Sequence, residues 1–221
     1  MTPLPERGRL PPVNHRLPIQ SNGIIVGSNP YLDSDLILRV VCQGEGKVSL
    51  LAKYARKSSK RFGVQLDIFD CGKIEAEAGR GSLMILKSFI PLQSFGNLRM
   101  SLEKMTAASV VCECFDFLLH EDVPDEVDIY ELLRLSLTGI DQEQTPAAIA
   151  AIAFETIVRL LSASGFGARS EFEPRGTKAF ERALTRVEEV ANRGLKSKGH
   201  LGILLGQLKP QAVIPHLASK T

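Results

Sequence analysis

The spacing of apolar residues in this chain changes its period once, near residue 96. Before that point, short runs rich in valine, isoleucine and leucine are separated by glycine turns such as Gly44-Glu45-Gly46, a pattern typical of strands joined by hairpins. After it, apolar residues recur at three- and four-residue steps, which indicates helices. The switch predicts an α+β chain with a disordered Pro- and Arg-rich leader over residues 1–20, a β domain over 21–95 and a helical domain over 96–221.

Five strands are expected in the β domain. They occupy residues 23–27, 34–43, 47–54, 67–78 and 82–92, and the last is broken at Pro91 because proline cannot donate a ladder hydrogen bond. Short strands in an open sheet would leave long unpaired edges. A closed barrel avoids such edges, and five strands suit the oligonucleotide/oligosaccharide-binding (OB) barrel. An SH3-like barrel is the alternative.

Four helices are expected in the second domain, over residues 98–120, 128–140, 147–163 and 177–192. The third is apolar on most of its faces and includes Ile152 and Ile157. A helix that is apolar all round is usually buried, so we expect this one at the centre of the helical core. No apolar run approaches the roughly 20 residues that span a bilayer, and the first 20 residues lack the apolar segment of a signal peptide. We therefore expect a cytoplasmic protein without membrane contact.

The strongest local feature is a basic loop after the third predicted strand. No acidic residue occurs between Glu45 and Asp67, and the loop combines cations, serines and the aromatic ring of Tyr54. Cations bind phosphates, hydroxyls donate to them, and aromatic rings stack on bases. Strands two and three of an OB barrel usually form its oligonucleotide face, so the position of this loop favours nucleic-acid binding. The candidate nucleic-acid-binding residues are Arg39, Lys47, Lys53, Tyr54, Arg56, Lys57, Lys60 and Arg61.

A solvated loop without a ligand would have the same composition, and the formal net charge of only +2 requires acids elsewhere to balance it. Alternation along the third strand places Lys47 and Ser49 on one face and Val48 and Leu50 on the other. The loop leaves from the end of this strand, which is why we interpret the face of Lys47 as part of the binding surface.

The chain contains no recognisable catalytic or metal-binding motif. Its four cysteines form no CxxC pair, and Cys112 and Cys114 point to different faces of a predicted helix. Its four histidines lie in the leader, at a helix end and in the tail, away from any nucleophile in a motif context. We predict no catalytic residues, no metal, no cofactor and free thiols, and hence a protein that binds rather than reacts.

Several segments, in order, resemble the RecO family. They are Gly23-Ile24-Ile25-Val26, Pro30-Tyr31-Leu32-Asp33-Ser34-Asp35, Gly46-Lys47-Val48-Ser49, Ala55-Arg56-Lys57-Ser58 with Arg61-Phe62-Gly63, Gly79-Arg80-Gly81-Ser82-Leu83, and Leu160-Leu161 followed by Gly165-Phe166-Gly167. The resemblance covers roughly residues 21–167. Many members of that family carry a four-cysteine zinc motif just after the last segment, but residues 168–178 contain no cysteine here, so we predict no zinc. We identify no resemblance to the family after about residue 177.

The resemblance implies an OB-fold domain followed by helices, and a DNA-binding recombination mediator that is not an enzyme. It implies binding of single- and double-stranded DNA, annealing of complementary strands, and work with a RecR-type partner and single-strand-binding protein to load RecA indirectly, in association with the nucleoid. Two alternatives remain open. An RNA- or ribosome-associated OB protein would use the same loop, because phosphates carry no sequence information. The second alternative is an enzyme whose active site is assembled from residues distant in the sequence.

Overall fold

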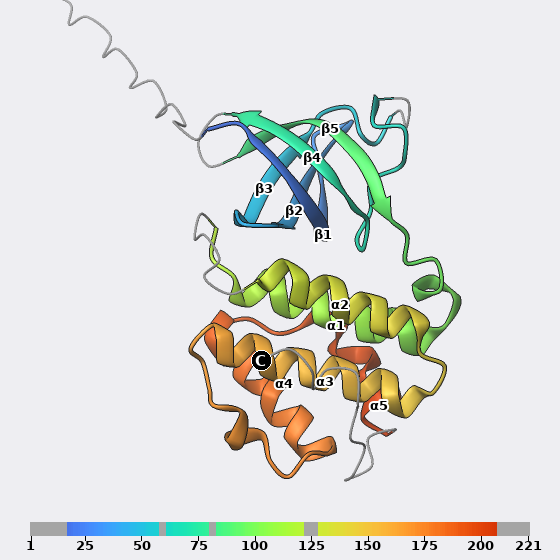
Figure 1. Ribbon diagram of the computed structural model, residues 1–221, viewed down its shortest axis with the longest axis vertical. Helices are drawn as coiled ribbons and strands as arrows, with labels where there is room; N and C mark the ends of the chain where they lie inside the picture. The colour runs from blue at the N-terminus through green and yellow to red at the C-terminus, as the bar shows by residue number, and fades with distance from the viewer. Residues whose placement is uncertain (1–16, 58–60, 80–82, 122–127, 207–221) are drawn as a thin grey trace, which may run out of the picture.

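A computed structural model gives the fold of the chain and describes residues 17–57, 61–79, 83–121 and 128–206. Figure 1 shows a β-barrel at one end of the molecule and a layered group of helices at the other. The α+β class predicted from the change of period is confirmed. The predicted leader lies outside the described residues except for its last four positions, of which Ile19 and Gln20 already belong to the first strand.

The barrel contains five strands and is closed. They are β1 (Ile19–Tyr31), β2 (Asp35–Cys42), β3 (Gly46–Ala52), β4 (Cys71–Ala78) and β5 (Met84–Gln93), in the order β1-β2-β3-β5-β4. All neighbouring pairs are antiparallel except the short parallel pair of β3 with β5. The prediction of a five-stranded OB barrel is therefore confirmed.

Two strands extend further than their local sequence predicts. β1 starts at Ile19 rather than residue 23, because Ile19 to Asn22 pair with β4 even though most of them are polar. β5 continues through Pro91, which pairs with Gly72 next to an irregularity in the register of β4 and β5. A missing N–H is tolerated at such an irregularity, so the predicted break at Pro91 is wrong.

The helical part contains four long helices. They are α1 (Leu102–Leu118), α2 (Ile129–Gln142), α3 (Pro146–Ala163) and α4 (Thr177–Ala191). Shorter turns of helix are η2 (Leu98–Met100), η3 (Arg169–Phe172), η4 (Lys196–His200) and α5 (Leu201–Leu205). The predicted helix over 98–120 is divided at Ser101, whose extended backbone ends η2 and whose hydroxyl accepts a hydrogen bond from the Lys104 N–H at 3.2 Å. This N-cap starts α1 anew.

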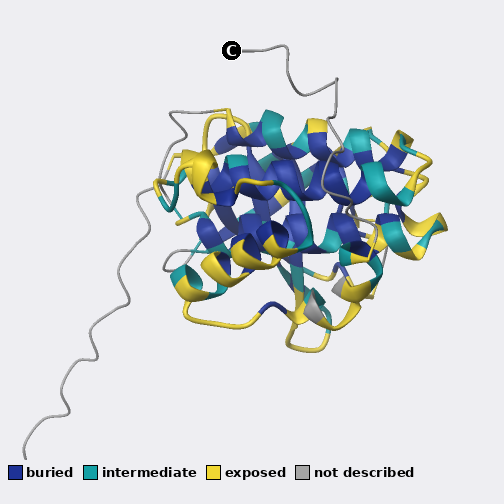
Figure 2. Cartoon of the chain, turned by 90° about the horizontal axis from the view of Figure 1, so that it is seen from below, coloured by how far each residue is buried: buried dark blue, intermediate teal, exposed yellow. Residues whose placement is uncertain are grey.

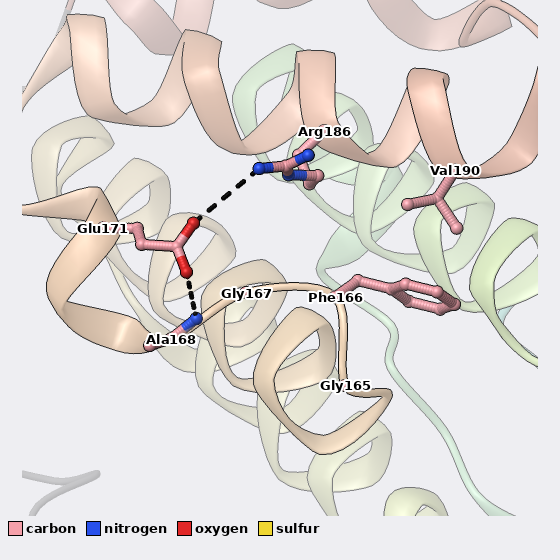
Figure 3. Close-up of a pocket in the computed structure, with 7 residues that line it drawn as sticks. All are labelled: Gly165, Phe166, Gly167, Ala168, Glu171, Arg186 and Val190. Atoms are coloured by element: carbon pink, nitrogen blue, oxygen red, sulfur yellow. Dashed lines mark hydrogen bonds and ion pairs between the residues drawn. The ribbon is translucent and has the colours of Figure 1, made fainter.

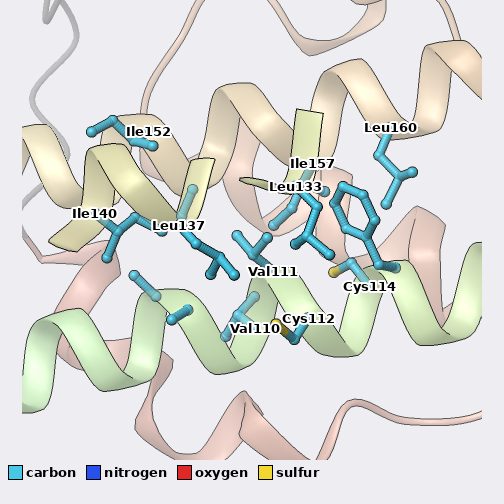
Figure 4. Packing of buried hydrophobic residues seen from close by; sticks show 14 of the residues in the cluster. Val110, Val111, Cys112, Cys114, Leu133, Leu137, Ile140, Ile152, Ile157 and Leu160 are labelled. Atoms are coloured by element: carbon cyan, nitrogen blue, oxygen red, sulfur yellow. The ribbon is translucent and has the colours of Figure 1, made fainter. Parts of the chain in front are cut away.

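α3 is the central helix of the bundle, as predicted. Ile157 is fully buried and Ile152 nearly so. Figure 4 shows both side chains with Leu160, facing residues of α1 and α2 such as Val111 and Leu137. Among the described residues, α3 is the one helix long and apolar enough to cross a membrane, yet 67% of it is buried inside the protein. That burial is expected of a core helix.

The barrel and the helices share part of one hydrophobic core. One buried cluster fills the barrel and includes Ile25, Leu38 and Leu50. A second cluster joins α1, α2, α3 and α4 to side chains that point outward from the barrel, including Ile24, Val26, Val41 and Phe69. In Figure 2, seen from the helical side, buried residues run through the bundle while its rim is exposed. An apolar interface of this kind holds the two parts in a fixed relative position.

Candidate nucleic-acid interface

The described parts of the basic loop after β3, residues 53–57 and 61–66, are anchored to the barrel. Ala55, Phe62 and Leu66 are buried in the barrel cluster. The Arg56 N–H donates to the Ser34 carbonyl at 2.9 Å, and the Tyr54 N–H donates to the Asp35 carboxylate at 2.8 Å. These bonds fix the loop against the turn between β1 and β2. In Figure 1 this loop lies at the end of the barrel that is away from the helices.

Two exposed side chains in this region occupy left-handed backbone conformations. Tyr54 has φ of 62° and a side chain that is 58% exposed, and Leu32 in the β1–β2 turn has φ of 49° and is 72% exposed. Positive φ is uncommon for residues other than glycine, and such positions are concentrated at functional sites. Tyr31, at the end of β1, is also exposed. The turn and the loop therefore present aromatic and apolar side chains to solvent.

The loop also carries several cations. Arg56, Lys57 and Arg61 are exposed, and Lys53 is half-buried. The Arg56 guanidinium approaches the Leu32 carbonyl at 3.4 Å, while the Arg61 guanidinium lies 5.3 Å from the centre of the Phe62 ring. We call the set Tyr31, Leu32, Lys53, Tyr54, Arg56, Lys57 and Arg61 the loop surface. Lys60, the remaining predicted residue of the loop, lies outside the described residues.

Lys47 requires a correction, because the structure places it in the interior. Its side chain is only 8% exposed, and its ammonium donates to the Asp116 carbonyl of α1 and lies 3.5 Å from the Asp116 carboxylate. Burial lowers the pKa of Lys47, and the neighbouring Asp116 partly opposes that shift. A phosphate cannot reach this ammonium, so the prediction that Lys47 extends the binding surface is wrong.

Arg39 is also directed toward α1 rather than toward the loop. Its Nε donates to the Asp116 carboxylate at 2.8 Å, and an arginine beyond α4, Arg193, approaches the same carboxylate at 3.9 Å. We call Arg39, Lys47, Asp116 and Arg193 the interdomain cluster. The Ser49 hydroxyl, on the same face of β3 as Lys47, donates to the Glu121 carboxylate. The outer face of β2 and β3 is thus covered by the helical part, and the alternation along β3 could not reveal that.

The segment after Gly165-Phe166-Gly167, where the resemblance raised the question of zinc, is held by ion pairs. Glu171 accepts a hydrogen bond from the Ala168 N–H at 2.8 Å and lies 3.7 Å from the Arg186 guanidinium of α4, as Figure 3 shows. Glu155 of α3, a buried carboxylate, contacts Arg159 at 2.9 Å, Arg175 at 3.1 Å, and Arg169. These contacts fix the segment by charge pairing.

We predict that the purified protein contains no stoichiometric zinc. All four cysteines are free and buried, and burial raises the pKa of Cys42 to about 12 and the pKa of Cys114 well above its usual range. A thiol that remains protonated at neutral pH is a poor metal ligand. Elemental analysis of the purified protein is the measurement, and about one equivalent of tightly held zinc per chain would contradict the prediction.

Two family models match consecutive parts of this chain. The model described as the N-terminal part of recombination protein O matches residues 17–95, and the model of its C-terminal part matches residues 99–186. The first match coincides with the barrel, and the second extends from η2 into α4.

The chain is also similar in sequence to curated proteins of the same family. A DNA repair protein RecO of Desulfatibacillum aliphaticivorans is 35% identical over 150 residues, which cover 67% of this chain and 57% of the relative. One of Symbiobacterium thermophilum is 33% identical over 146 residues (66% and 56%), and one of Syntrophus aciditrophicus is 31% identical over 134 residues (60% and 51%). The matched part of the chain thus spans little more than half the length of these relatives.

Proposed function

The chain belongs to the RecO family, and from this premise we propose that it is a recombination mediator in DNA repair. In this role it binds single- and double-stranded DNA, anneals complementary strands, and helps to load a recombinase onto DNA coated by single-strand-binding protein. It does so by binding, without a covalent step.

The loop surface is the observation that carries the proposal. Arg56, Lys57 and Arg61 are exposed on a loop whose backbone is fixed to the β1–β2 turn, beside the exposed rings of Tyr31 and Tyr54. Fixed cations bind the phosphates of a single strand, and aromatic rings stack on its bases without selecting a sequence. Because the backbone at Tyr54 and Arg56 is bonded to the β1–β2 turn, little backbone entropy is lost there when a strand binds.

Annealing follows from the same charges. Two complementary strands repel each other through their phosphates, and cations of the loop surface lower that repulsion when they replace condensed counterions. Binding and annealing should therefore both weaken as salt concentration rises. The exposed bases that pair in annealing carry the sequence information, so the protein needs no sequence preference of its own.

We propose protein partners for the helical part, in line with the family. These are a RecR-type partner and single-strand-binding protein, with RecA reached indirectly. A chain that anneals and loads in this way works at the nucleoid in the cytoplasm and requires no cofactor.

A strand-annealing assay with and without single-strand-binding protein tests the proposal. We expect the protein to accelerate annealing of complementary DNA strands in both conditions, and unlabelled DNA to compete better than RNA of the same sequence at matched salt. Failure to anneal in either condition would contradict the mediator function. Stronger competition by RNA would instead support an RNA- or ribosome-associated OB protein.

A further inference from the structure

A cleft of about 690 Å3 lies between β1, α1 and the segment that follows α4. Three cations line it, namely Arg39, Arg193 and Lys196, together with the apolar side chains of Leu102, Met105 and Phe117. The cleft is separate from the loop surface and opens along the junction of the barrel with the helical part. Its combination of cations and apolar side chains suits a ligand with both an anionic and a flat apolar group.

The carboxylates that line the cleft are already engaged within the protein. Glu113 accepts hydrogen bonds from the Lys196 N–H at 2.8 Å, the Ser197 N–H at 3.0 Å and the Ser197 hydroxyl at 2.6 Å. Asp116 is buried and is shared by the three cations of the interdomain cluster. The lining of the cleft thus holds three cations and two carboxylates, a formal net charge of +1, which favours an anion.

Arg193 is arranged as a platform for a flat group. Its guanidinium lies 3.6 Å from the centre of the Phe117 ring, so one of its faces is stacked on that ring. The distance of 3.9 Å to Asp116 is longer than a hydrogen bond, and the side chain is 54% exposed. The guanidinium therefore has a second face on which a nucleobase can stack.

Arg39 of β2 approaches the same Asp116 carboxylate from the barrel. Its guanidinium crosses β1 at Gly27, where an added Cβ would lie 2.1 Å from Nη2. The bond from Nε to Asp116 holds the side chain while leaving part of it accessible in the cleft. An arginine held in this way can donate to a phosphate with little loss of freedom.

Strand β1 leads from the cleft to the loop surface. Gly27, Ser28 and Asn29 line the cleft, and Tyr31 and Leu32 follow directly in the chain. Gly27 and Tyr31 are four positions apart in the extended strand, a distance of about 13 Å at 3.3 Å per residue. A single strand held on the loop surface can therefore reach the cleft within a short length.

We infer that this cleft is a subsite for one unstacked nucleotide of a bound single strand. Its base stacks on Arg193 beside Met105, and its phosphate lies on Arg39. The inference rests on the proposed function and adds to it a preference for single strands, because a base inside a duplex stays stacked and cannot enter.

A fluorescent reporter in the cleft tests the inference directly. The chain has no tryptophan, so Met105→Trp, at a position that lines the cleft and is 40% exposed, gives a single signal. Its emission should be quenched by oligothymidylate of about 16 nucleotides, the upper site size of one OB fold. Leu135→Trp, exposed on α2 and not among the residues that line the cleft, is the matched control and should not respond.

A second variant tests the platform. Arg193→Gln should lower the affinity for the oligonucleotide about tenfold, because it removes a stacking contact, and should change the slope of log affinity against log salt little, because that contact is to a base and not to a phosphate. Arg182→Gln on α4 removes the same charge outside the cleft and should leave the affinity nearly unchanged. Thermal melting of both variants checks that each is folded.

The outcomes separate the inference from the proposed function. One outcome is that fluorescence anisotropy shows the Met105→Trp variant binding the oligonucleotide while its tryptophan emission does not change. That result would overturn the cleft subsite and leave the loop surface as the interface. No binding of oligonucleotide to the unmodified protein would overturn both. Quenching by an acidic peptide and not by oligonucleotide would assign the cleft to a protein partner and also overturn the inference.

Discussion

Replacing Arg56, Lys57 and Arg61 with Glu is expected to weaken binding of single-stranded DNA by at least about 100-fold and to stop annealing. A hydrogen bond to a charged group contributes about 1.5–3 kcal/mol, so loss of three phosphate contacts more than accounts for this factor before the added repulsion is considered. The slope of log affinity against log salt should decrease by about 2, from about 0.7 for each single-strand contact. Anisotropy titrations with labelled oligonucleotide at several salt concentrations give both quantities.

The control is an equal reversal at Lys178, Arg182 and Arg186 of α4. Both triple variants change the net charge by the same amount, so a general electrostatic effect would weaken binding alike. The loop variant should remain folded, since the three side chains are exposed while Ala55, Phe62 and Leu66 keep the loop anchored. If the α4 variant loses binding and the loop variant keeps it, DNA binds to the helical part and the loop surface is not the interface.

Asp116→Asn is expected to destabilise the protein by about 3 kcal/mol at neutral pH. Among the described residues, Asp116 has the only carboxylate in contact with the buried Lys47 ammonium, and the change removes it. Removal of one partner of a buried ion pair costs about 3–5 kcal/mol of stability. The asparagine side chain keeps an oxygen that can accept a hydrogen bond from Arg39. The expected loss of stability therefore lies at the lower end of this range. Chemical denaturation of the parent and the variant measures the difference.

The loss of stability in Asp116→Asn should become smaller as pH rises. The pKa of Lys47 is lowered in the folded protein and should fall further without Asp116, because Asp116 raises it. Between the folded-state pKa and the ordinary value of 10.5, the unfolded chain holds a proton that the folded chain has lost, so stability increases with pH in that window. The deficit of Asp116→Asn is therefore largest at neutral pH and becomes smaller toward about pH 10.

A double variant identifies the cause. Lys47→Met in the Asp116→Asn background removes the unpaired ammonium and should recover more than half of the lost stability. A deficit that is unchanged by Lys47→Met, or that does not depend on pH, would show that Asp116 acts through Arg39 or through packing instead.

Local patterns predict the elements of this protein well, because strands and helices depend on neighbours in the sequence. The alternation along β3 correctly separates Val48 and Leu50, which fill the barrel, from Lys47 and Ser49. What covers the second face depends on α1, whose Asp116 is 69 residues away from Lys47, and no local pattern contains that information.

The candidate interface shows the same limit. The cations of the loop could be recognised from composition, but Tyr31 and Leu32 join them only because hydrogen bonds bring the β1–β2 turn beside the loop. The sequence did contain a signal for the turn, because Tyr31 and Leu32 lie between Pro30 and Asp33. Large side chains within a turn are expected to be exposed to solvent. The sequence carried no such signal for Arg193, because its contact with the Phe117 ring of α1 joins residues far apart in the chain.

Because the barrel and the helices share part of one hydrophobic core, neither part is expected to be stable as a separate fragment. A fragment that ended after β5 would expose Ile24, Val26 and Val41 to water and leave the Lys47 ammonium without Asp116. Such a fragment should associate or aggregate rather than serve as a portable DNA-binding module. Exchange of halves between related genes should therefore succeed only where the outward face of the incoming barrel matches the helices that it meets.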